Sequence, residues 1–217
     1  MGLQESIIFT LEIVGTIAFA ASGAMVGVRK SMDIFGVCVL GVLTAVGGGM
    51  TRDIIVGVIP PAVFQRPVYV AVAAVTSCLF FAGMYFGKIS AQEKSHGIYE
   101  KIMLAMDTAG LGIFTVVGVS TGIRQGYGDN LFLLVFLGTI TGVGGGLMRD
   151  IMAGVPPYIF VRHIYACASI AGAVACAFLS QKTDLVTAMA AGMAVVIVMR
   201  VLAAYYRWNL PRLKEKE

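Results

Sequence analysis

The feature that most constrains this chain is an eight-residue motif that occurs twice inside long apolar stretches. Residues 46–53 read VGGGMTRD and residues 143–150 read VGGGLMRD. Each glycine costs about 1 kcal/mol relative to alanine in a helix interior, and an Arg-Asp pair is expensive in a lipid phase. The fold must therefore explain why apolar helices carry both features at two matched positions.

The composition indicates that these stretches fold in a membrane. Hydrophobic residues make up 58% of the 217 residues, charged residues make up 13%, and the mean hydropathy is +0.87. Soluble domains carry about a quarter charged residues, so we expect an all-α polytopic membrane protein. A span needs roughly 20 mostly apolar residues. The pattern predicts seven transmembrane helices, at about 7–28, 34–56, 67–86, 101–123, 131–153, 164–179 and 185–206.

The two motifs belong to a longer internal repeat. Repeat 1 covers about residues 7–86 and repeat 2 about 101–180, within a single transmembrane domain of residues 1–206 that a polar cytoplasmic tail, 207–217, follows. The repeats match a series of residues in order. The matched pairs are Glu12 and Asp107, Gly15 and Gly110, Gly23 and Gly118, Gly27 and Gly122, Thr44 and Thr141, Gly57 and Gly154, and Tyr69 and Tyr165.

Each repeat holds three expected spans, and an odd number makes the second repeat enter the membrane from the opposite side. The sequence therefore predicts an inverted 3+3 repeat plus one accessory helix, 185–206, an arrangement typical of transport proteins. Lys and Arg favour cytoplasmic loops. Ten of them fall in the loops and tail on one side and three on the other, which predicts an inner-membrane protein with its N-terminus outside and its C-terminus in the cytoplasm.

The glycine triplets predict a break or kink in the second and fifth spans. A break exposes backbone polar groups, which a membrane protein tolerates where they line a water-filled path. We therefore expect a central path at the triplets, with nearby hydroxyl groups along it. The expected residues are Gly47, Gly48, Gly49, Gly144, Gly145 and Gly146 at the breaks, and Thr44, Thr51 and Thr141 beside them. The alternative is that the glycines only let helices pack closely.

The charged residues of the motifs allow several roles. Arg52 and Arg149 could act at a gate, could pair with Asp150 and Asp53 across the pseudo-twofold axis or with the intramembrane carboxylates Glu12 and Asp107, or could snorkel to the interface. Adjacent Arg and Asp residues are not expected to face each other on a regular helix. The GxxxG pairs predict close helix packing within or between subunits. These pairs are Gly23 with Gly27 and Gly118 with Gly122.

Other chemistry finds little support in the chain. We find no nucleophile–base arrangement, phosphate loop or metal-ligand cluster, so we expect no enzyme, no cofactor and no metal site. The four cysteines lie in apolar segments without a CxxC motif, which favours a packing role. No basic-aromatic stripe suggests a nucleic acid partner; the expected surroundings are the lipid bilayer.

The doubled Gly-Gly-Gly-x-x-Arg-Asp motif, the double prolines 60–61 and 156–157 and the 3+3+1 layout resemble the trimeric intracellular cation (TRIC) channels, most of all the prokaryotic branch. The resemblance covers nearly the whole chain. It implies a homotrimer with a pore through each subunit, pore-lining spans 2 and 5, and conduction of K⁺ and Na⁺, which would bind only transiently.

The same broad family includes bacterial glycine transporters. A carrier for glycine or another small zwitterion is therefore the alternative to a potassium-permeable channel, because a helix break offers amides for a carboxylate and carbonyls for an ammonium group. A membrane scaffold that uses its glycines only for packing is a third possibility.

Overall fold

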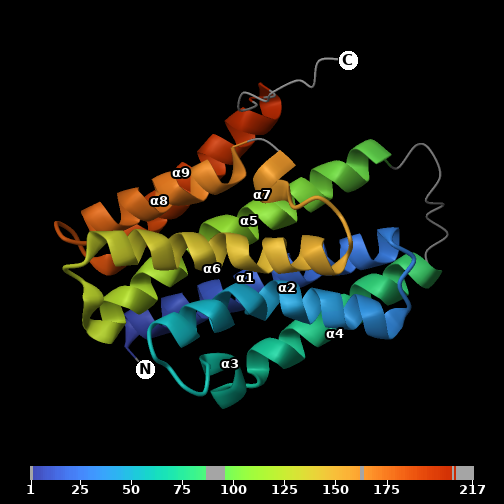
Figure 1. Ribbon diagram of the computed structural model, residues 1–217, viewed down its shortest axis with the longest axis horizontal. Helices are drawn as coiled ribbons and strands as arrows, with labels where there is room; N and C mark the ends of the chain where they lie inside the picture. The colour runs from blue at the N-terminus through green and yellow to red at the C-terminus, as the bar shows by residue number, and fades with distance from the viewer. Residues whose placement is uncertain (1, 87–95, 162–163, 207, 209–217) are drawn as a thin grey trace.

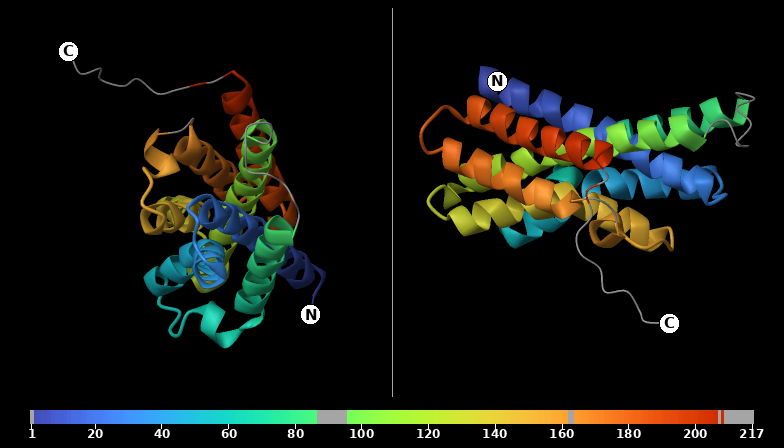
Figure 2. Two further views of the ribbon diagram at one scale, coloured as in Figure 1. Left: turned by 90° about the vertical axis from the view of Figure 1, so that its right-hand side faces the viewer. Right: turned by 90° about the horizontal axis from the view of Figure 1, so that it is seen from above.

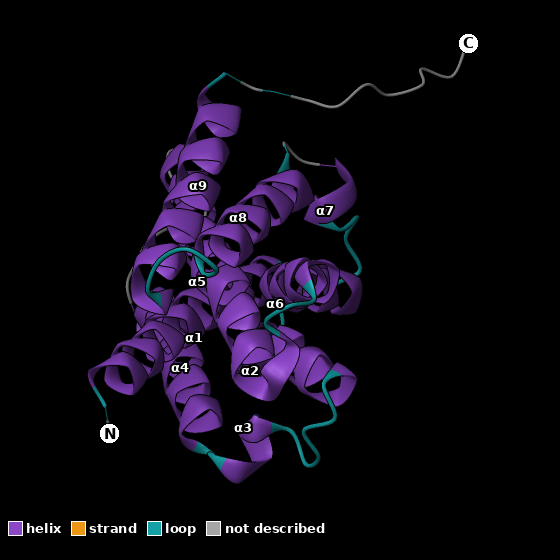
Figure 3. Cartoon of the chain, turned by 90° about the vertical axis from the view of Figure 1, so that its left-hand side faces the viewer, coloured by secondary structure: helices purple, strands orange, loops and turns teal. Residues whose placement is uncertain are grey.

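A computed structural model describes residues 2–86, 96–161, 164–206 and 208. Every regular element in this part of the chain is a helix, and short loops connect the helices (Figure 3). The expected polar tail lies outside the described residues, apart from Trp208. Several loop lysines and arginines that set the expected orientation, Lys88 and Arg162 among them, also lie outside them.

The helices follow the expected order of the two repeats. Repeat 1 forms α1 (Leu3–Arg29), α2 (Ile34–Ile55), the short α3 (Ala62–Gln65) and α4 (Val68–Phe86). Repeat 2 forms α5 (His96–Gly122), which continues into the π-helical segment η1 (Ile123–Tyr127), then α6 (Leu131–Met152), the short α7 (Tyr158–Val161) and α8 (Tyr165–Leu179). The last helix is α9 (Leu185–Tyr205).

Among the described residues, six helices are long and apolar enough to cross a membrane, and they make the chain a multi-pass membrane protein. These helices are α1, α2, α4, α5, α6 and α9. The remaining expected span corresponds to α8, which is apolar but has only 15 residues. At 1.5 Å per residue it measures roughly 22 Å, less than the roughly 30 Å of a hydrocarbon core. A seventh complete span therefore stays a prediction.

The two repeats form a single bundle in which they run in opposite directions. In Figure 1, α1 and α4 run from left to right along the long axis, whereas α5 and α8 run from right to left. The packing repeats as well: α1 packs on α2 and α4, and α5 packs on α6 and α8. α2 and α6 pack against each other and join the repeats, as the end-on view in Figure 2 also shows. α9 lies on α5 and α8.

Matched signals begin and end the two central helices. The side chain of Asp33 accepts a hydrogen bond from the Gly36 amide at the start of α2, as an N-cap does. Asn130 caps α6 in the same way through the Leu133 amide. After each helix a glycine with positive φ, Gly57 at 76° or Gly154 at 62°, turns the chain back. The following amide bonds to a carbonyl five residues earlier, which is the Schellman motif that favours glycine.

The expected breaks at the glycine triplets are not found, because α2 and α6 each run through their triplet as one continuous helix. The two helices cross at the middle glycines. A Cβ on Gly48 would lie 2.3 Å from the Thr141 carbonyl oxygen, and one on Gly145 would lie 2.0 Å from the Thr44 carbonyl oxygen. Backbone contact between the helices therefore explains the glycines at this crossing, and helix propensity alone does not register such a contact.

The GxxxG pairs lie at close crossings within the chain. A Cβ on Gly23 would lie 2.8 Å from the Gly41 Cα, where α1 crosses α2. A Cβ on Gly118 would lie at the same distance from the Gly138 Cα, where α5 crosses α6. Gly27 and Gly122 extend the two contacts by one turn, against Val37 and against Leu134 and Leu137.

Candidate functional site

Each Arg-Asp pair of the doubled motif is buried and has further polar side chains near it. The two clusters lie near opposite ends of the bundle, because α2 and α6 run in opposite directions and each pair lies in the last turns of its helix. We call the group Glu12, Arg52, Asp53 and Tyr69 the Arg52 cluster. The second group, the Arg149 cluster, consists of Ser22, Asp107, Arg149, Asp150 and Arg200.

Within each motif the adjacent arginine and aspartate bind each other, contrary to the sequence-based expectation. Arg52 donates from Nε and Nη2 to Oδ1 of Asp53, at 2.9 and 2.7 Å. Arg149 donates from Nε to Oδ1 of Asp150 at 2.8 Å. Neighbouring side chains diverge on a helix, but an arginine side chain is long enough to fold back toward its neighbour. The motif therefore supplies its own counter-ion.

The second oxygen of each aspartate fixes the loop after its helix. Oδ2 of Asp53 accepts a hydrogen bond from the amide of Ala62, the first residue of α3, at 2.8 Å. Oδ2 of Asp150 accepts one from the amide of Tyr158, the first residue of α7, also at 2.8 Å. Each aspartate thus joins the end of a central helix to the short helix that follows it.

The charged side chains of the Arg149 cluster are fully enclosed by protein. Arg149 is fully buried and donates from Nη1 to Ser22 at 2.5 Å and to Oδ1 of Asp107 at 2.8 Å. The predicted pairing with Asp107 is therefore present, and burial excludes snorkelling of Arg149. Arg200 of α9, only 2% exposed, places Nη2 3.8 Å from Oδ2 of Asp107. Its guanidinium also lies over the ring of Tyr165 at 4.8 Å.

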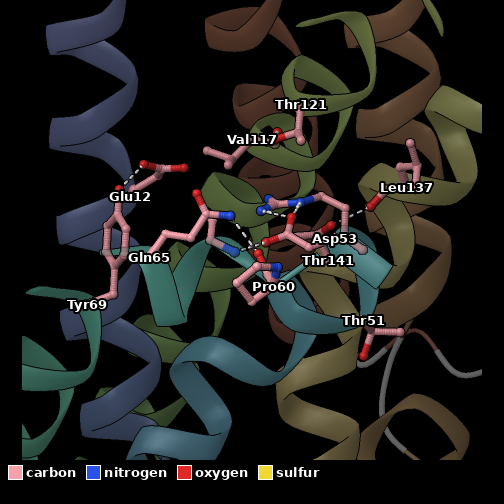
Figure 4. A network of polar contacts seen from close by, with 12 residues as sticks. Glu12, Thr51, Asp53, Pro60, Gln65, Tyr69, Val117, Thr121, Leu137 and Thr141 are labelled. Atoms are coloured by element: carbon pink, nitrogen blue, oxygen red, sulfur yellow. Dashed lines mark hydrogen bonds and ion pairs between the residues drawn. The ribbon is translucent and has the colours of Figure 1, made fainter. Parts of the chain in front are cut away.

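The Arg52 cluster has a different arrangement although its residues match. Glu12, the counterpart of Asp107, accepts a hydrogen bond from the hydroxyl of Tyr69, the counterpart of Tyr165. Figure 4 shows this pair on α1 and α4, across from Asp53. In the register of the repeats, Val117 stands where Ser22 stands in the other half, so an apolar side chain replaces the hydroxyl. Among the described residues, Arg52 forms its ion pair with Asp53.

A cavity of about 290 Å³ lies at the Arg52 cluster, between the two repeats. Residues of α1, α2, α3, α4, α5 and η1 line it. Its polar lining consists of Glu12, Thr16, Arg52, Asp53, Gln65, Arg66, Tyr69, Thr121, Arg124 and Gln125. Arg52 is 7% exposed and its charge is balanced by Asp53. Glu12 therefore supplies a carboxylate that the motif does not neutralise.

The third glycine of each triplet faces the polar cluster at its own end. Gly49 lines the cavity, and Arg52 is the nearest group to a Cβ placed there, at 3.7 Å. A Cβ on Gly146 would lie 3.0 Å from the Tyr165 hydroxyl and 3.8 Å from Oδ1 of Asp107. The first glycines differ: Gly47 faces the sulfur of Met148, and Gly144 faces the backbone of Gly48.

The three expected threonines each donate to a carbonyl of their own helix. Thr44 donates to Leu40 and Thr141 donates to Leu137, both at 2.6 Å, and both side chains are buried at helix crossings. Thr51 is partly buried and donates to Gly47. Among the described residues, no group of three or more His, Cys, Asp or Glu side chains could hold a metal ion.

The sequence reasoning missed Ser22 and Arg200 in the Arg149 cluster. Ser22 belongs to repeat 1 but contacts Arg149 of repeat 2, and a single serine in an apolar helix gives no signal of such a contact. Arg200 carries a signal, because an arginine within a span is by default a sign of a functional or paired site. Its position outside the repeat left it without a counterpart to compare.

Fold and site together define a class: a multi-pass helical membrane protein with inverted repeats and a polar cavity between them. A family model described as "Glycine transporter" matches residues 9–85 and 104–181. A UPF0126 membrane protein of Deinococcus radiodurans is 38% identical over 93% of this chain and 89% of its own length. The UPF0126 inner membrane protein YadS of Escherichia coli K12 is 36% identical, over 94% and 95%.

Solved structures extend the comparison. One, described as the basis for conductance through TRIC cation channels, is 32% identical with a TM-score of 0.81, over 96% of this chain and 98% of that one. The TRIC orthologue from Rhodobacter sphaeroides is 28% identical with a TM-score of 0.83, over 94% and 100%. The chain belongs to the family that joins the UPF0126 membrane proteins and the TRIC proteins. These relatives are membrane proteins and not enzymes, as the sequence predicted.

Proposed function

We propose that this protein is a potassium-permeable channel for monovalent cations, with a pore through each subunit between the two repeats. The observation that carries the proposal is the likeness to solved TRIC cation channels over nearly the whole chain. K⁺ and Na⁺ would occupy the pore transiently, and no cofactor is required. The Rhodobacter sphaeroides relative is described as a trimeric channel, which supports a homotrimer.

The cavity at the Arg52 cluster supports an entrance to the pore at this end. Glu12 gives the cavity a carboxylate, and oxygen atoms and negative charge attract cations. An arginine in a cation path would raise a barrier. Asp53 balances Arg52, but Arg66 and Arg124 line the same cavity, so cations would have to pass on the side of Glu12. The close crossing at Gly48 and Gly145 leaves no room for an ion between the helix backbones, so the path would pass beside the crossing rather than through a helix break. We propose further that the glycine triplets let these helices bend during conduction.

The likeness to the inner membrane protein YadS supports an inner-membrane location. With the N-terminus outside, as the loop charges suggest, the cavity would open outward, because the N-terminus and the cavity lie at the same end of the bundle.

Currents through planar bilayers that contain the purified protein test the proposal. In a tenfold KCl gradient the current through a perfectly potassium-selective pore reverses at about 59 mV, with the sign expected for a permeant cation. A reversal potential of the opposite sign would show anion conduction. No current, with the protein verified as inserted, would refute the channel.

A carrier for a small zwitterion is the alternative, and it is kept because the matching family model is described as a glycine transporter. The cavity offers a carboxylate from Glu12 and exposed guanidinium groups from Arg66 and Arg124, which could pair with an ammonium and a carboxylate. Counterflow of labelled glycine in proteoliposomes, without unitary currents, would establish the carrier in place of the channel.

A further inference from the structure

The two ends of the protein differ most at the counterpart carboxylates Asp107 and Glu12. Asp107 is fully buried and lies against two arginines, Arg149 at 2.8 Å and Arg200 at 3.8 Å. Glu12 is half-buried, lines the cavity and accepts a hydrogen bond from Tyr69. One end of the bundle is therefore packed shut around its carboxylate, and the other is hollow beside it.

A helix outside the repeat supplies the additional arginine. α9 packs on α5 and α8 of repeat 2, and its position late in the chain gives repeat 1 no counterpart. Arg200 reaches Asp107 from α9, whereas Arg149 reaches it from α6 and Ser22 joins from α1. The carboxylate of Asp107, on α5, thus connects α5 with α6 and α9 at this end.

We propose that Arg200 keeps the Arg149 end of the protein closed to water by holding Asp107 against Arg149. Arg200 is a positioning residue in this account and touches no permeating ion. The inference concerns water access at this end and goes beyond the proposed conduction. It rests on the proposed channel function only where it implies an effect on ion current.

The charge balance of the cluster gives the physical reason. Two carboxylates, Asp107 and Asp150, face two guanidinium groups, Arg149 and Arg200, and each of the four residues is at most 2% exposed. Buried ions persist when they are paired and become costly when a partner is removed. Without the charge of Arg200, the cluster holds one negative charge in excess. Admitting water to Asp107 relieves that excess, and water then opens this end.

Labelling of a cysteine at position 103 measures this opening. Met103 is 5% exposed and lies one turn before Asp107 on α5, and its sulfur is 3.6 Å from the Tyr158 hydroxyl. The substitution Met103→Cys is made after the four native cysteines are replaced by alanine, and a membrane-impermeant thiol reagent is added to the full-length protein. Adding Arg200→Gln should raise the labelling rate about tenfold or more, because a closed end opens only as a minor state of about 0.1–10%. Arg200→Lys, which keeps the charge, should stay near the parent rate.

A double variant separates positioning from a general loss of packing. If Arg200 acts by balancing Asp107, Arg200→Gln should lower the labelling rate in an Asp107→Asn background, because the double variant leaves Arg149 and Asp150 balanced. Equal increments in both backgrounds would show a merely structural role and overturn the proposal. So would a parent-level labelling rate in a monodisperse Arg200→Gln protein.

If Arg200→Gln alone does not assemble, the double variant still decides, because it leaves Arg149 and Asp150 balanced. Slow labelling of the double variant, near the parent rate, supports the proposal, and fast labelling, equal to that of Asp107→Asn, refutes it. Labelling requires no current. If Arg200→Gln raised the labelling rate but the protein carried no potassium current, the role of Arg200 would stand and the channel would be rejected. If the protein carried current but Arg200→Gln left the labelling rate unchanged, the channel would stand and the role of Arg200 would be rejected.

Discussion

Replacing Gly145 by alanine tests whether the glycine triplets serve the crossing of α2 and α6. The new Cβ would lie 2.0 Å from the Thr44 carbonyl oxygen, whereas carbon–oxygen contacts are ordinarily about 3.3 Å or longer. The obstacle is backbone and cannot rotate away, so the helices must separate by more than about an ångström. Overpacking of this kind costs about 1–3 kcal/mol or more.

That cost should appear as a lower melting temperature in detergent. For a chain of this size each kcal/mol corresponds to about 2–4 °C, so Gly145→Ala should lower the melting temperature by roughly 2–12 °C. Gly48→Ala should act in the same direction, because its Cβ would lie 2.3 Å from the Thr141 carbonyl oxygen. Gly83→Ala is the matched control: nothing lies within 4 Å of a Cβ on Gly83, inside α4.

The control should melt at the parent temperature or slightly above it, because alanine is the better helix former. If Gly145→Ala had the same melting temperature as Gly83→Ala and still assembled, the crossing of α2 and α6 would be looser than in the structure. A role of the glycines in a helix break would then return as the better explanation.

Three further predictions concern individual charges. Glu12→Gln should lower the unitary potassium conductance, by roughly tenfold at low ionic strength if the cavity carboxylate concentrates cations, and less at high salt; Glu12→Asp should retain most of it, and equal conductance in Glu12→Gln would remove the cavity from the path. Asp53→Ala should destabilise the protein by about 3–5 kcal/mol, because it leaves Arg52 buried without its partner, and an unchanged melting temperature would contradict this. The pKa of Asp184, which precedes α9, is held below its ordinary value because its carboxylate accepts hydrogen bonds from the backbone amide and the hydroxyl of Thr187. The ionised form therefore stabilises the fold: the effect is complete above the ordinary pKa of about 3.9 and is lost as the pH falls through the lowered value. The difference in melting temperature between the parent and Asp184→Ala should narrow only in strongly acidic buffer, and a difference that narrowed near neutral pH would be inconsistent with this origin.

The helices were predictable because strong signals bound them. Expected spans at 34–56 and 131–153 correspond to α2 and α6, which end at Ile55 and Met152. Caps and positive-φ glycines at the same offsets in both halves explain this agreement. The inversion of the repeats followed from the odd number of spans in each, and it depends on connectivity rather than on side chains.

The site was predictable in its residues but not in its contacts. The pairing of Arg149 with Asp107 was among the expected alternatives, because the repeat placed a carboxylate at a matched depth in each half. The breaks were wrongly expected because helix propensity does not register a neighbouring backbone, and contact with Thr44 and Thr141 determines the middle glycines. The difference between the two ends was not predictable from the repeat, because it arises from residues that break the symmetry. Val117 stands opposite Ser22 in the register, and Arg200 lies outside both halves.

Modification of a single cysteine in the cavity tests most directly whether ions pass between the repeats at the Arg52 cluster. Thr121 lines the cavity, and Asp129, exposed in the loop after η1, is not among its lining residues. Each position is changed to cysteine after replacement of the native cysteines, and a positively charged methanethiosulfonate reagent is applied during recording. We predict that the reagent abolishes most of the potassium current of Thr121→Cys and leaves that of Asp129→Cys intact. Full current through completely modified Thr121→Cys protein would contradict a path through this cavity.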